Sequence, residues 1–142
     1  MKKTILILVI GALFIQSCKE KSAKIIDVSS IKIEGVQLDN GKLWAANAET
    51  TEGIKKMQQL VATFSNNNNL EKYTSLTTQL ETEFSNVFAK CTMKGEAHNQ
   101  LHNYLKPMIG IFENLTASES KIRKENYSIL ESHLAGYANY FE

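Results

Sequence analysis

Apolar residues recur every three or four positions along four stretches of the chain, from about residue 47 to the C-terminus. This spacing places them on one face of an α-helix, because each residue advances the helix by about 100°. The stretches cover roughly residues 47–65, 70–92, 96–115 and 117–142. Short turns between consecutive helices make neighbouring helices antiparallel. We therefore predict an all-α fold, an antiparallel up-down four-helix bundle.

Two of the predicted turns carry helix-capping signals. Four consecutive asparagines at positions 66–69 favour a turn over a helix interior, and Asn68 with Glu71 fits an N-terminal cap for the second helix. Thr116 and Glu119 match a capping box, with the threonine as cap of the fourth helix. These signals set the expected helix boundaries.

A short β-hairpin is predicted ahead of the first helix. Apolar residues in the segments 31–38 and 43–44 flank the dipeptide Asn40-Gly41. Asn-Gly between such segments is a strong signal for a two-residue turn joining antiparallel strands. Because an isolated hairpin is only marginally stable, we expect it to lie against the helices with Trp44 as its anchor.

The first 17 residues resemble the signal peptide of a bacterial lipoprotein. Two lysines precede an apolar run, residues 4–15, that is too short to span a bilayer. Ser17 stands directly before Cys18, as in a lipobox, with Ile15 where that pattern usually has leucine. The resemblance implies cleavage before Cys18, its acylation with fatty-acyl (palmitate) chains, and anchoring in the outer membrane facing the periplasm. An ordinary secretory signal and an uncleaved membrane anchor are the alternatives.

The rest of the chain divides into a tether and one domain. Residues 18–30 are polar and charged and are interpreted as a flexible tether, and residues 31–142 as one domain containing the hairpin and the bundle. The 142 residues include 16 basic and 15 acidic side chains, and Arg123 is the sole arginine. Nucleic-acid binding needs a basic stripe, so no nucleic-acid partner is expected. The lipid anchor would have to provide the membrane contact.

The run CTMKGEAHNQLH concentrates candidate metal ligands. Cys91 ends the second predicted helix and Gly95 turns the chain, so antiparallel pairing places Cys91 opposite His98. His98 and His102 are four residues apart and lie one turn from each other on one helix face. Pairing of the third and fourth helices sets His133 within a turn of His102.

These four side chains predict a transition-metal site at one end of the bundle. Thiolate and imidazole ligands suit zinc and copper. Met93 and Glu96, on the adjoining turn, are candidate additional ligands. If Cys18 is acylated, Cys91 is the only free thiol and has no internal disulfide partner.

The same residues have a structural interpretation. Cysteine is among the most buried residue types, and histidines at a bundle end can satisfy helix termini or bond to tyrosines. A Cys-His nucleophile pair would need an oxyanion hole and an orienting group, and no catalytic signature surrounds Cys91. We therefore expect no enzyme. The alternative to metal binding is an interaction or accessory module for another envelope protein.

The segment CTMKGEAHNQLHNYL, together with LDNGKLW and the lipobox, resembles a group of small envelope lipoproteins of Bacteroidota type. The likeness extends over most of the chain after the signal peptide, and residues 91–105 are its most specific part. The resemblance implies an envelope location and a four-helix domain, and it assigns no functional residues.

Overall fold

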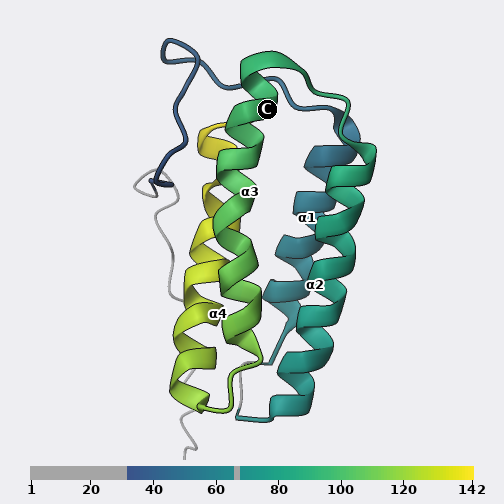
Figure 1. The fold of residues 1–142 in the computed structure, drawn as a ribbon, viewed down its shortest axis with the longest axis vertical. Helices are drawn as coiled ribbons and strands as arrows, with labels where there is room; N and C mark the ends of the chain where they lie inside the picture. The colour runs from purple at the N-terminus through teal and green to yellow at the C-terminus, as the bar shows by residue number, and fades with distance from the viewer. Residues whose placement is uncertain (1–31, 66–67) are drawn as a thin grey trace, which may run out of the picture.

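The computed structural model describes residues 32–65 and 68–142, and its described part is all-α. The four predicted helices are confirmed, and they lie side by side with α1 against α2 and α3 against α4, as in an up-down bundle (Figure 1). The predicted signal peptide and tether lie outside the described residues. The elements are α1 (Ala48–Thr63), α2 (Leu70–Lys90), α3 (Gly95–Leu115), α4 (Ser120–Ala135) and the 3-10 helix η2 (Gly136–Asn139).

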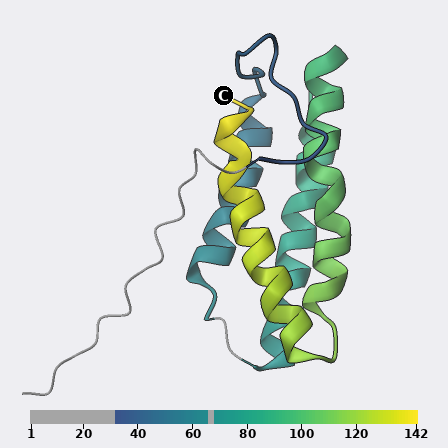
Figure 2. The ribbon, with the colours of Figure 1, turned by 90° about the vertical axis from the view of Figure 1, so that its left-hand side faces the viewer.

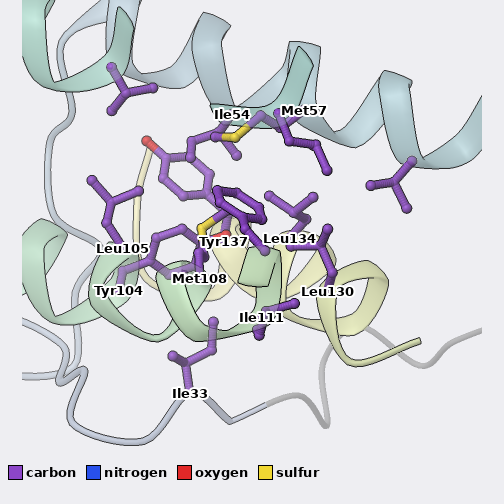
Figure 3. Close-up of a cluster of buried hydrophobic side chains, with 14 of the residues drawn as sticks. Ile33, Ile54, Met57, Tyr104, Leu105, Met108, Ile111, Leu130, Leu134 and Tyr137 are labelled. Atoms are coloured by element: carbon purple, nitrogen blue, oxygen red, sulfur yellow. The ribbon is translucent and has the colours of Figure 1, made fainter. Parts of the chain in front are cut away.

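The apolar stripes of the helices meet in one core (Figure 3). Ile54 and Met57 of α1, Met108 of α3 and Leu130 and Leu134 of α4 are almost completely removed from solvent. Burial of each such side chain contributes about 1.5–3 kcal/mol, so the stripes hold the helices together without a disulfide.

The predicted β-hairpin is wrong. Asn40 (φ 49°) and Gly41 (φ 86°) do form a tight turn, closed by two backbone hydrogen bonds of 2.9 Å between Asp39 and Lys42. That pair is an isolated bridge, and no strand follows it in residues 32–65. The predicted Asn-Gly turn is therefore present, but within residues 32–65 no strand pairing extends it.

The chain after the turn pairs instead with the C-terminus. The amide of Trp44 donates to the Tyr140 carbonyl at 2.8 Å, and the amide of Glu142 donates to the Trp44 carbonyl at 3.0 Å. A third hydrogen bond joins Ala46 to Glu142 at 2.9 Å. The segment before α1 therefore crosses the bundle end near the C-terminus (Figure 2), where Trp44 packs partly buried against the core.

Two predicted caps are also corrected. Asn69, and not Asn68, caps α2, because its side chain accepts a hydrogen bond from the Lys72 amide at 3.1 Å. The capping box at Thr116 does not form: Thr116 ends α3 and bonds back to the Glu113 carbonyl. Helix α4 begins only at Ser120, so its first turn lies outside the predicted box.

Arg123 ties together the two connections at the end of the bundle drawn lowest in Figure 1. This side chain is buried, and its guanidinium donates to the carbonyls of Ala117 at 2.6 Å and Ser118 at 2.8 Å, between α3 and α4. It also donates to the Asn68 carbonyl at 3.0 Å, before α2, and lies over the Tyr73 ring at 5.4 Å. The sole arginine is thus a structural clamp.

Candidate metal site

The site lies at the turn between α2 and α3. Helix α2 stops at Lys90, and Cys91 has an extended backbone (φ −67°, ψ 121°). Gly95 has φ 63°, a left-handed conformation that favours glycine, and α3 begins there. This turn brings Cys91 to the first turn of α3, where its Sγ lies 3.6 Å from Nδ1 of His98. The predicted opposition of Cys91 and His98 is therefore present.

His98 and His102 meet one helical turn apart on α3. Their Nε2 atoms are 3.0 Å from each other, and their ring centroids are 4.4 Å apart. His98 is half-buried and His102 is exposed, with its ring against that of Phe88 at 5.4 Å. The imidazole of His98 thus stands between the thiol on one side and His102 on the other.

A small cavity of about 50 Å³ adjoins these side chains. That volume is enough for one water molecule or one ion. Its walls are apolar apart from the cysteine and the two histidines, so the inner side of the histidine pair is shielded from solvent. The lining residues are Val87, Phe88, Cys91, His98, Leu101, His102 and Leu105.

The structure does not bring His133 to the other three residues. His133 is buried, and its Nε2 bonds to the Tyr104 carbonyl at 2.8 Å, while the Tyr104 hydroxyl donates to the His133 carbonyl at 3.1 Å. Tyr104 lies two residues after His102, about 200° around α3. His133 therefore contacts α3 on the face away from His102, and it lines a separate cavity with Ile33 and Ser128.

Burial determines the protonation of His133. Loss of solvation lowers the pKa of His133 below its usual value, and the hydrogen bond to the Tyr104 backbone opposes that shift in part. Because the partner atom is a carbonyl oxygen, Nε2 must carry the proton and donate it. A neutral imidazole with Nε2–H is thus a structural donor that joins α4 to α3.

The two candidate additional ligands have other partners. Met93 is half-buried and packs against the core. Glu96 is exposed, and its carboxylate accepts hydrogen bonds from Gln100 at 2.7 Å and Asn99 at 3.1 Å. Both hydrogen bonds lower the pKa of Glu96, and the one from Gln100 has the larger effect. The Gln100 side chain in turn accepts from the Gln37 amide at 2.8 Å, so Glu96 helps to fix the segment before α1.

The ligand set is therefore smaller than the sequence predicts. Among residues 32–65 and 68–142, no group of three or more His, Cys, Asp or Glu side chains is arranged to hold a metal ion. A single imidazole offers one nitrogen to a given ion, and His98 directs Nδ1 to Cys91 and Nε2 to His102. The arrangement therefore supplies two ligand nitrogens, one from His98 and one from His102. Cys91 contacts the other ring nitrogen of His98.

Asn47 also supports the site, although it is not among the residues predicted from the sequence. Its Nδ2 donates to the Lys90 carbonyl at 3.1 Å, and its Oδ1 accepts from the Thr92 amide at 3.3 Å. These bonds hold the two residues that flank Cys91 to the start of α1. An asparagine directly before a helix is a signal for capping, but its role across α2 depends on tertiary contact.

Comparison of the chain with protein-family models, with curated proteins and with solved structures found no match. Among the helices that the structure describes, none is both long and apolar enough to cross a lipid bilayer.

Proposed function

We propose that this protein binds a transition-metal ion, zinc or copper, through Nε2 of His98 and Nε2 of His102. The observation that carries the proposal is the 3.0 Å separation of these two nitrogens. Two nitrogens bound at 2.0–2.1 Å to a tetrahedral ion lie about 3.4 Å apart. At 3.0 Å one Nε2 donates its proton to the other, so metal binding would replace this hydrogen bond. The donor nitrogen would lose its proton, and both rings would turn until their lone pairs point at the ion, with the nitrogens about 0.4 Å farther apart.

Cys91 supports this pair as a partner of His98 and not as a ligand. A metal-bound histidine commonly donates its second ring N–H to a neighbouring acceptor, which fixes the tautomer and the ring orientation. The Cys91 Sγ, 3.6 Å from Nδ1 of His98, has that position. When Nδ1 carries the proton, the Nε2 lone pair of His98 is free for the metal.

Zinc and Cu²⁺ fit this pair better than Cu⁺ does. Imidazole suits all three ions, but a linear two-coordinate Cu⁺ would need its nitrogens about 4 Å apart. That spacing requires His98 and His102 to separate by about a further 1 Å. Thioether coordination, which favours Cu⁺, would require Met93 to leave the core against which it packs.

We also propose that the metal site lies in the cell envelope. Acylation of Cys18 and removal of residues 1–17 would tether the domain to the outer membrane, so that the bundle holds or hands on the metal in the periplasm without catalysing a reaction. Cys18→Ser in the native host should abolish labelling by a fatty-acid analogue. Labelling that persists in this variant would contradict the anchor.

Metal titration of the purified full chain in detergent tests the binding proposal. A Cys18→Ser background leaves Cys91 as the one thiol, since the chain has two cysteines. We expect Zn²⁺ or Cu²⁺ binding in the micromolar range or tighter. The double variant His98→Ala/His102→Ala should lose it, and Cys91→Ser should weaken it by about 10–100-fold without abolishing it.

His133→Gln is the matched control, because it changes a histidine outside the pair. It should retain full metal affinity. Absence of binding in the micromolar range or tighter, or a double variant that binds as the parent does, would contradict the proposal.

An accessory module is the second candidate, and exposed apolar side chains near the histidines favour it. Phe88 is 41% exposed and Ile109 is 52% exposed. In that case Cys91→Ala and His98→Gln variants would keep partner binding, and Phe88→Ser would lose it. Loss of partner binding in a correctly folded His98→Gln variant would count against a purely structural role for that residue.

A further inference from the structure

The His98–His102 pair leaves a tetrahedral metal ion with two open coordination positions. In the part of the chain that the structure describes, no third His, Cys, Asp or Glu side chain is placed to fill either position. His133 is held by Tyr104, and Glu96 by Gln100 and Asn99. Water, another molecule or a second copy of the chain must therefore complete the site.

We propose that a second copy of this chain completes it, so that zinc bridges a symmetric homodimer. This inference rests on the proposed metal binding. A metal ion on the two-fold axis would receive His98 and His102 from each of two copies. Four imidazole nitrogens in a tetrahedron satisfy the coordination that zinc prefers in closed sites, and a two-fold axis makes the same surface serve on both copies.

The surface around the pair suits such contact. His102 is exposed, and the ring of Phe88 on α2 lies 5.4 Å from its ring. Ile109 follows His102 by seven residues, two helical turns, and so lies on the same side of α3. A second copy bound at His102 would cover apolar area on Phe88 and Ile109 that is otherwise in water.

The dimer also explains why the site is a pair of imidazoles at the surface. A structural zinc site within one chain would need four ligands around a buried ion. Here the thiol next to the pair, that of Cys91, contacts Nδ1 of His98 and not His102. Coordination between copies needs no further ligand from either chain.

Sedimentation velocity on the full Cys18→Ser chain in density-matched detergent tests the proposal. We expect a monomer in EDTA, a dimer with half an equivalent of Zn²⁺, and X-ray absorption showing four nitrogen ligands. His98→Ala should stay monomeric with zinc. Cys91→Ser should still dimerise with zinc, which separates metal bridging from an intermolecular disulfide.

Ile109→Ser and Ile129→Ser form a matched pair, because both isoleucines are 52% exposed but Ile129 lies on α4. Ile109→Ser should weaken zinc-dependent dimerisation by about 10-fold or more, and Ile129→Ser should leave it unchanged. If one zinc binds per monomer at every protein concentration, the dimer is wrong and metal binding stands. If no zinc binds, both proposals fail. A dimer that forms in EDTA and survives His98→Ala also overturns the zinc bridge.

Discussion

Replacement of His133 distinguishes a structural histidine from a metal ligand. His133→Ala removes the 2.8 Å hydrogen bond to the Tyr104 carbonyl, which contributes about 1 kcal/mol. It also removes a buried ring whose centroid lies 4.6 Å from that of Tyr104, and the resulting cavity adds to the cost. We expect a total loss of about 2–4 kcal/mol in the free energy of unfolding. His133→Gln keeps an N–H donor and should lose about 1 kcal/mol.

The pH dependence provides a second signature of His133. Burial lowers its pKa in the folded state, so the unfolded chain binds a proton more readily. The stability that neutral His133 provides is complete above about pH 6.5, the ordinary histidine pKa, and is lost as the pH falls through the lower folded-state value. The parent protein should therefore lose more stability between pH 7.5 and 5.5 than His133→Gln does.

Urea denaturation followed by circular dichroism at both pH values measures these differences, with zinc titration in parallel. The structural assignment would be refuted if His133→Ala cost less than about 0.5 kcal/mol, a value typical of surface positions. It would also be refuted if His133→Gln lost zinc as completely as His98→Ala. Equal pH dependence in parent and His133→Gln would contradict the buried neutral imidazole.

Two further predictions concern the packing of the bundle. A Cβ on Gly53 would lie 2.5 Å from Val87 Cγ2, in a rigid side chain that lines the cavity, whereas a Cβ on Gly110 meets nothing within 4 Å. Gly110→Ala should therefore stabilise the fold by about 0.5–1 kcal/mol. Gly53→Ala should destabilise it by about 1–2 kcal/mol, and Val87→Ala should restore part of that loss. Equal effects of the two glycine changes on thermal unfolding would contradict this. Arg123→Met leaves three carbonyls without their donor and should lower the free energy of unfolding, measured by urea denaturation, by about 2–4 kcal/mol. The control Lys124→Met, on the exposed face of α4, should lower it by less than about 0.5 kcal/mol. Similar losses in the two variants would argue against the clamp.

The sequence by itself determined the four helices and the local part of the site. Each helix buries a stripe that repeats every three or four residues, so α2 and α3 lie within a few residues of their predicted limits. Cys91, His98 and His102 come together because one turn and one helical repeat separate them. Contacts over so few residues follow from backbone geometry that the sequence encodes directly.

Tertiary structure decided what lies farther apart along the chain. Antiparallel pairing predicts how far along the bundle axis His133 lies. The rotation of each helix about its own axis determines which neighbour the side chain contacts. In the structure His133 contacts Tyr104. The Asn40-Gly41 turn forms as predicted, yet the backbone groups of Trp44 bond to Tyr140 and Glu142 at the C-terminus. Backbone donors accept any correctly placed carbonyl, so the fold of the whole chain selects their partner.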